Sequence, residues 1–244
     1  MIDLNTIYSL FKPGLRLATV ASFVHRGTVV ADIGTDHAYL PLYLVTKKSC
    51  PRVVAVEKSQ NNCENARDII CFYNQAHKIE VRCADGLKAL QERDGVEVIV
   101  IAGLGGKTIC QLLMAAGNSL DRYRRLVLQP MGDASLLRRW LLSRGYAIIK
   151  EKLCQERKRF YEVIVAEKGS MKFTDPFILE LGPALVSGSD PLLIPWIEHK
   201  INRYDEILQN LKISTGKGNE GKRQFLQIRL KKLKDVLRDV SQRE

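Results

Sequence analysis

Short apolar runs alternate with helical patterns over the first two thirds of the chain. Strand-like runs cover residues 29–33, 53–56, 79–83, 96–102 and 126–128, and helical patterns cover 60–75, 108–116 and 134–143. Short, β-branched runs that are apolar on both faces are typical of strands buried in a parallel sheet. Strands alternating with helices predict a doubly wound α/β sheet with right-handed crossovers. Asp133 is a candidate N-cap of the helix at 134–143.

The pattern changes between residues 146 and 167. Two strand-like runs, 146–151 and 160–167, are joined by a short, polar and basic segment that leaves no room for a crossover helix. We therefore expect these two strands to pair antiparallel. A mostly parallel, seven-stranded, Rossmann-like sheet with an antiparallel last strand is the layout of class I methyltransferases, whereas dinucleotide-binding domains continue to alternate.

A third pattern follows residue 170. Prolines and glycines interrupt residues 171–190, which predicts a linker. Apolar residues then recur in alternating steps of four and three, first at Ile197, Ile201, Tyr204, Leu208 and Leu211 and again at Leu226, Leu230, Leu233, Leu237 and Val240. The polar stretch 214–221 separates the two series. The sequence thus predicts an α/β domain with the methyltransferase layout at 1–170, a linker at 171–190 and an antiparallel α-helical coiled-coil hairpin at 191–244.

Composition narrows the class of partner. The chain has 244 residues, of which 45% are hydrophobic and 27% charged, and its formal net charge is +11. This composition is globular, and the excess of cations favours a polyanion such as nucleic acid, although it could serve solubility alone. The six cysteines form no C-x-x-C pair and the four histidines are isolated, so we expect no metal site. No signal peptide and no membrane-length apolar run is recognisable, which predicts a cytoplasmic protein that contacts no membrane.

The residues that follow the predicted strands are candidates for ligand binding, because open α/β sheets bind ligands at the carboxyl ends of their strands. In chain order they are Asp32, Gly34, Asp36, His37, Glu57, Lys58, Asp85, Gly86 and Gly103. Glu57 is placed to accept hydrogen bonds from the hydroxyls of a ribose, and Asp85 is placed to accept one from an adenine amino group. Gly34, which has no side chain, lets a cofactor approach the backbone. The first turn reads G-T-D-H-A-Y instead of G-x-G-x-x-G, and Asp36 would repel a pyrophosphate. A nucleoside cofactor without phosphates, S-adenosylmethionine, fits this set.

Six segments together resemble one family. They are ADIGTDHAYLP (31–41), VAVEK (54–58), ADGL (84–87), IAGLGG (101–106), LQP (128–130) and YEVIVAE (161–167). This set resembles the bacterial TrmK family, which methylates N1 of adenine 22 in tRNA with S-adenosylmethionine. The resemblance implies that Asp32, Gly34, His37, Glu57, Asp85 and Gly86 contact the cofactor. It also implies that Asp36 acts on the target adenine.

The chemistry of adenine N1 suggests a specific role for Asp36. N1 carries an in-plane lone pair and needs no deprotonation before it attacks a methyl group, so the demands are in-line positioning and exclusion of water. The base becomes cationic as the bond forms, and a carboxylate beside it would stabilise the transition state. We therefore expect Asp36 to act electrostatically or to orient the base, and not as an obligatory general base. The alternative is that Asp36 only caps the helix that begins near Ala38.

Cations cluster late in the chain. The candidates for RNA contact are Arg138, Arg139, Arg157, Lys158, Arg159, Lys222, Arg223, Arg229, Lys231 and Lys232. Both clusters outnumber the acids near them, which favours phosphate contacts with tRNA over a merely solvated face. Because N1 is usually occupied in folded RNA, the enzyme would have to extrude the nucleotide. Two other readings stay open: a small-molecule methyltransferase of the same fold, and a non-catalytic RNA-binding protein. We expect a monomer, although the hairpin could also pair with a second copy.

Overall fold

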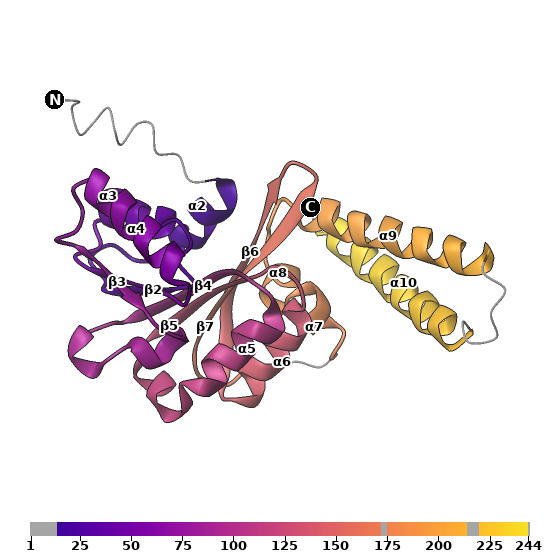
Figure 1. Cartoon of the computed structure of the whole chain (residues 1–244). Helices are drawn as coiled ribbons and strands as arrows, with labels where there is room; N and C mark the ends of the chain where they lie inside the picture. The colour runs from indigo at the N-terminus through magenta and orange to yellow at the C-terminus, as the bar shows by residue number, and fades with distance from the viewer. Residues whose placement is uncertain (1–13, 172–174, 214–219, 244) are drawn as a thin grey trace. The chain divides into compact units, whose positions relative to one another are not determined.

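The computed structural model describes residues 14–171, 175–213 and 220–243. The chain divides into two compact units, Met1–Lys172 and Phe173–Glu244. The first unit contains a seven-stranded sheet and the second contains a pair of long helices. Figure 1 shows the elements of both units.

The sheet of the first unit confirms the predicted topology. Its strands are β1 (Val30–Ile33), β2 (Val53–Glu57), β3 (Ile79–Cys83), β4 (Val98–Leu104), β5 (Arg125–Pro130), β6 (Tyr146–Glu156) and β7 (Arg159–Lys168), in the order β3-β2-β1-β4-β5-β7-β6. Strands β1 to β5 pair parallel with their neighbours, and β7 is antiparallel to both β5 and β6. At their shared turn, β6 runs five residues past its predicted end, whereas β7 begins one residue before its predicted start. A ladder that continues to Glu156↔Arg159 satisfies the backbone of these polar residues as well.

Helices cover both faces of the sheet. They are α2 (Leu15–Ser22), α3 (Tyr39–Lys47), α4 (Gln60–Phe72), α5 (Gly106–Ala115) and α6 (Ala134–Ser143), with short 3₁₀ segments η1 (Gly86–Ala89), η2 (Glu92–Asp94) and η3 (Gly117–Arg122). Figure 1 shows α3 and α4 on one face and α5 and α6 on the other. Helix α2 packs on the α3 side, where Val20 and Leu44 are buried in one core cluster with Val53 and Val100 of the sheet. Burial of such aliphatic side chains is worth about 1.5–3 kcal/mol each.

The start of α6 corrects one expectation. Asp133 occupies the N-cap position, but its backbone is left-handed (φ 56°) and its side chain makes no capping hydrogen bond. Its carbonyl oxygen instead accepts the amide of Leu137 at 3.1 Å. An N-cap residue normally needs extended dihedrals to turn its side chain onto the first amides, which the left-handed geometry prevents.

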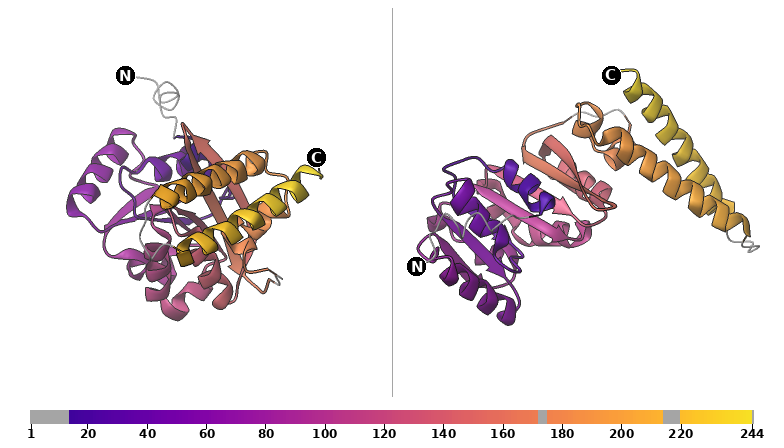
Figure 2. Two further views of the ribbon diagram at one scale, coloured as in Figure 1. Left: turned by 90° about the vertical axis from the view of Figure 1, so that its right-hand side faces the viewer. Right: turned by 90° about the horizontal axis from the view of Figure 1, so that it is seen from above.

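The second unit contains a helical hairpin. Helices α9 (Leu193–Ile213) and α10 (Glu220–Ser241) lie side by side in opposite directions in both views of Figure 2. Of the apolar series predicted to form their seam, the buried members are Ile197, Ile201 and Leu208 of α9 and Leu226, Leu233 and Val240 of α10. The helices are therefore long and amphipathic as predicted, while a true coiled coil stays a prediction. The polar loop predicted at 214–221 lies mostly outside the described residues.

The segment predicted as a linker is folded in the structure. Residues 178–181 and 183–186 form the short helices α7 (Ile178–Leu181) and α8 (Pro183–Val186). Phe177, Leu179, Leu181 and Leu185 are buried, so this stretch belongs to the core of the second unit. The prolines that suggested a linker sit at permitted positions, such as Pro183 at the first position of α8. Among the described helices, none is both long and apolar enough to cross a bilayer.

Candidate functional site

A pocket of about 550 Å³ opens at the carboxyl ends of the central strands. The strand order reverses between β1 and β4, because β2 lies beyond β1 and β5 lies beyond β4. Crossovers leave this point of a doubly wound sheet in opposite directions and create a crevice there. The pocket walls come from the turn after β1, the ends of β2 and β4, and the start of α2.

The turn after β1 supplies a buried carboxylate and a close backbone approach. Asp32 is buried, and the hydroxyl of Thr35 donates a hydrogen bond to its carboxylate. Burial raises the pKa of Asp32 to about 6, because the loss of solvation outweighs that hydrogen bond and the negative charge of Glu57 adds to it. Gly34 has φ +86° and donates its amide to Val56 at 2.8 Å, so the chain turns sharply away from the sheet.

Asp36 and His37 form the outer wall. The Asp36 carboxylate is 63% exposed, and its Oδ2 lies 3.3 Å from Nε2 of His37, whose ring is 5.5 Å from that of Tyr39. Helix α3 begins after Ala38, which is left-handed (φ 53°), and no side chain caps it. The alternative in which Asp36 serves as the helix cap is therefore wrong. Its carboxylate remains available at the pocket, which Tyr39, a residue that is 46% exposed, also lines.

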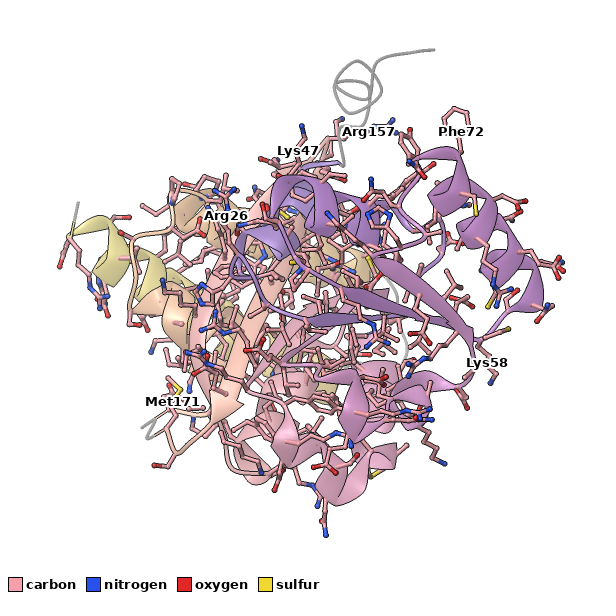
Figure 3. All side chains as sticks on the ribbon, turned by 90° about the vertical axis from the view of Figure 1, so that its left-hand side faces the viewer. Arg26, Lys47, Lys58, Phe72, Arg157 and Met171 are labelled. Atoms are coloured by element: carbon pink, nitrogen blue, oxygen red, sulfur yellow. The ribbon has the colours of Figure 1, made fainter. Side chains whose placement is uncertain are left out.

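Glu57, at the end of β2, contributes a carboxylate to the pocket. Three other predicted cofactor contacts, Lys58, Asp85 and Gly86, do not line it. Oε1 of Glu57 accepts the amide of Ser59 at 2.7 Å, which fixes the carboxylate beside the pocket. Lys58 and Asp85 are mostly exposed and face each other at 3.9 Å, and neither lines the pocket (Figure 3 labels Lys58). Gly86 is also outside it: a Cβ there would lie 2.6 Å from Leu112, so its missing side chain serves helix packing. Cofactor contacts by Lys58, Asp85 and Gly86 stay predictions.

Gly103 and Arg16 complete the pocket lining, and the buried Gln129 contacts both; sequence reasoning assigned neither Arg16 nor Gln129. Gly103 has φ +81° at an irregularity in the pairing of β4 with β5. Its amide donates to Oε1 of Gln129 at 3.1 Å, and Nη1 of Arg16 donates to the same oxygen at 2.6 Å. Gln129 lies within the LQP segment (128–130), so the family resemblance had already drawn attention to this position. Arg16 precedes the first strand, and no local motif indicated that its side chain reaches the pocket.

The set of charges fits a cationic nucleoside. Asp32, Asp36 and Glu57 place three carboxylates around the pocket, which favours a positive ligand and repels a diphosphate. The carboxylate of Glu57 at the end of β2 suits a ribose, and Gly34 leaves room beside the backbone. The residues present are therefore compatible with S-adenosylmethionine. Among the described residues, no group of three or more His, Cys, Asp or Glu side chains is arranged to hold a metal ion.

The prediction that Arg138 contacts RNA is wrong. Its side chain is fully buried: Nε lies 2.6 Å from Oε1 of Glu151, and Nη2 lies 2.5 Å from Oε2 of Glu162. Arg138 therefore attaches α6 to β6 and β7 and presents no charge to solvent. The error arose because a helical pattern alone does not tell which arginine on α6 faces the sheet. The adjacent Arg139 is exposed.

The turn between β6 and β7 stands at the pocket edge of the sheet. Because β7 is antiparallel to β5, with Leu128 opposite Ile164, its start lies beside the carboxyl end of β5. Arg157, Lys158 and Arg159 are exposed there, and Figure 3 shows Arg157 projecting from the molecule. The topology thus brings the predicted basic turn to the same edge as Asp36.

The cations of α10 that were predicted to contact RNA divide into two kinds. Lys222 and Lys231 are exposed, and the part of the chain described here offers neither of them an ion-pair partner. Lys232 pairs with Asp175 at 3.2 Å, and Arg229 pairs with Glu180, so both help to attach α10 to the segment before α9. Arg223 is half-buried and lies 3.8 Å from Glu220. Only the first kind carries charge that is free for a phosphate.

Comparisons with known proteins agree on one family. Residues 30–235 match the family model TrmK, described as tRNA (adenine(22)-N(1))-methyltransferase. The tRNA (adenine(22)-N(1))-methyltransferase of Bacillus subtilis is 32% identical over 235 residues, covering 93% of this chain and 97% of that protein. A Streptococcus pneumoniae structure in complex with S-adenosyl-L-methionine is 33% identical, with a TM-score of 0.83 over 93% of this chain and 100% of that one. M. capricolum TrmK with S-adenosyl-homocysteine is 25% identical, with a TM-score of 0.77 over 93% and 98%.

Proposed function

Because the chain belongs to the TrmK family of tRNA (adenine(22)-N(1))-methyltransferases, we infer that it transfers the methyl group of S-adenosylmethionine to N1 of adenine 22 in tRNA. The observation that carries this inference is the pocket at the β1–β4 switch point, where Asp36 is exposed beside a buried acidic floor. A small-molecule methyltransferase would have no use for the exposed basic turn at the same edge.

Different residues of the pocket bind different parts of the cofactor. S-adenosylmethionine, when bound, supplies an electrophilic methyl group on a sulfonium. Glu57 accepts the ribose hydroxyls with the carboxylate that Ser59 holds in place. Asp32 presents a buried negative charge beneath Gly34, which lowers the energy of a cation in the pocket.

Asp36 acts on the target base. Its exposed carboxylate stands at the rim, where an extruded adenine would arrive, and Tyr39 offers a ring beside it. As N1 becomes methylated the adenine gains a positive charge, and the adjacent carboxylate stabilises that charge. His37, 3.3 Å from Asp36, holds the carboxylate in place and takes up no proton from N1, which has none to lose.

The substrate is a folded polyanion, and exposed lysine and arginine side chains bind its phosphates. The turn Arg157–Arg159 contacts phosphates near the target nucleotide, while Lys222 and Lys231 on α10 contact the body of the tRNA. We propose that the protein acts as a monomer, because α9 and α10 bury their apolar series against each other. Its place of action is the cytoplasm, and its chemistry requires no metal.

The test uses two transcripts of one unmodified tRNA, one with adenine and one with guanine at position 22. Each is incubated with the protein and S-adenosylmethionine labelled on the methyl group, and the nucleosides are then analysed. The adenine transcript should yield labelled 1-methyladenosine and the guanine transcript none. Labelling of both transcripts, or of another nucleoside, would contradict the proposed function.

A further inference from the structure

Two cysteines meet beside the pocket, where β2 leads into α4. Cys63 lies in the first turn of α4 and is completely buried, whereas Cys83 ends β3 and is exposed. The pairing of β2 with β3 sets Cys83 opposite Glu57, which lines the pocket. One thiol of this pair is therefore accessible from solvent, and the other is shielded from it.

Hydrogen bonds to the backbone after β2 bring the two sulfurs together. Sγ of Cys63 donates to the carbonyl oxygen of Glu57 at 3.3 Å. Sγ of Cys83 donates to the carbonyl oxygen of Lys58, the next residue, at 3.9 Å. The Glu57 oxygen also accepts the amide of Ala84 at 2.8 Å, and Ala84 directly follows Cys83. Because the two sulfurs bind adjacent carbonyls, they also lie within hydrogen-bond distance of each other.

The two thiols differ in their reactivity. Burial raises the pKa of Cys63 to about 11, and contact with the Cys83 thiol adds to the rise, so Cys63 stays protonated at neutral pH. The exposed thiol of Cys83 is the one that a small oxidant reaches first. Formation of a disulfide by an oxidant needs an accessible attacking thiol and a neighbouring thiol that resolves the oxidised sulfur. The structure divides these two tasks between Cys83 and Cys63.

We propose that Cys63 and Cys83 are a thiol pair that peroxides oxidise to a disulfide, and that this bond lowers the affinity of the pocket for its cofactor. The effect on the cofactor rests on the proposed function. The Cys83 thiolate attacks one oxygen of hydrogen peroxide, which breaks the O–O bond and gives a sulfenic acid and one water. The sulfur of Cys63 then attacks the sulfur of Cys83, and its proton leaves with the displaced oxygen as a second water. Two thiols lose two electrons and two protons, and one peroxide becomes two waters.

Formation of this disulfide changes the turn that holds Glu57. A disulfide sulfur has no S–H to donate, so both hydrogen bonds to the carbonyls of residues 57 and 58 are lost. The sulfurs must also approach to about 2.05 Å. The Glu57 carboxylate depends on the same turn, because its Oε1 accepts the amide of Ser59 at 2.7 Å and Ser59 caps α4. Asp85, the predicted adenine contact, lies two residues after Cys83. Oxidation therefore displaces both carboxylates that were predicted to bind the nucleoside.

The experiment compares the full-length wild type with Cys83→Ser and uses Cys71→Ser as the matched control. Cys71 is another exposed cysteine and lies on α4, the helix that carries Cys63. Each protein is treated with hydrogen peroxide, and catalase then removes the excess. Mass spectrometry of peptides prepared without reductant locates the disulfides. Calorimetry measures the binding of S-adenosylmethionine before oxidation, after oxidation and after reduction with dithiothreitol.

Wild type and Cys71→Ser should both yield the peptide pair that joins residues 63 and 83. Their affinity for S-adenosylmethionine should fall by about 10- to 100-fold, the loss expected for one hydrogen bond to a charged group, and should return after reduction. Cys83→Ser should form no such pair and keep its affinity through the same treatment. Before oxidation it should bind within about twofold of wild type, because a serine hydroxyl can also donate to the carbonyl of Lys58.

Three results would overturn the proposal. The first is a peroxide-treated wild type without the disulfide between residues 63 and 83. The second is a disulfide that leaves the affinity for S-adenosylmethionine within about twofold of the reduced protein. The third is an equal loss of affinity in peroxide-treated Cys83→Ser, which would place the relevant oxidation elsewhere. Peptide mapping needs neither cofactor nor methyl transfer, so it remains decisive even if the protein fails to methylate tRNA, a failure that would count against the proposed function alone.

Discussion

Replacing Arg138 with methionine tests the buried ion triad that joins α6 to the last two strands. The side chains of Arg138 and Glu151 are 0% exposed and that of Glu162 is 17% exposed. Burial by itself lowers the pKa of Arg138, but the two carboxylates outweigh burial and raise it, so the guanidinium stays charged. Methionine fills much of the same volume and supplies no charge, so the replacement removes the guanidinium that both carboxylates contact.

The expected cost follows from the loss of that guanidinium beside two carboxylates. Breaking a buried pair by removing one partner costs about 3–5 kcal/mol, because the remaining charge stays desolvated. For a unit of this size 1 kcal/mol moves the Tm by about 2–4 °C, so the loss corresponds to roughly 6–20 °C.

Calorimetric and urea unfolding of the full chain measure this loss, with Arg139→Met as the matched control. Arg139 is the next residue on the same helix and is exposed, so its replacement should change stability by no more than about 0.5 kcal/mol. Equal stabilities for the two variants, or a loss below about 1 kcal/mol for Arg138→Met, would refute the assignment of Arg138 to a buried structural triad.

Three further predictions concern the pocket and the RNA surface. Asp36→Ala should lower single-turnover methylation by about 10²- to 10³-fold while calorimetry shows nearly unchanged cofactor affinity; unchanged turnover would remove Asp36 from the reaction. Lys231→Gln should weaken tRNA binding and lower its salt slope by about 0.7–0.9, whereas Lys232→Gln, whose charge is already paired with Asp175, should do less; equal slopes would contradict the division of α10. Because burial raises the pKa of Asp32 from 3.8 to about 6, its ionisation destabilises the ligand-free fold above pH 6 and not below about pH 4. Asp32→Asn should therefore be more stable than wild type at pH 8, by up to about 3 kcal/mol, and equal to it near pH 4, and urea unfolding at the two pH values checks this.

The strands and the acidic strand ends could be predicted because they depend on local chemistry. The run 53–56 is apolar on both faces, and its burial between neighbours follows from that pattern alone. Asp32, Gly34 and Glu57 follow such runs directly, so the rule for the carboxyl ends of parallel strands places them together. The reversed final hairpin was also predictable, because no helix fits into its short connection.

The roles of the cations and of the segment before α9 depended on contacts between residues far apart in the chain. Arg138 and Arg139 are adjacent and chemically identical, and only packing against Glu151 and Glu162 decides which one is buried. Arg16 meets Gln129 across 113 positions, and Lys232 meets Asp175 across 57. Side-chain burial and pairing are properties of surfaces that form when the elements pack, so periodicity along the chain reports which face of an element is apolar but not which partner that face meets.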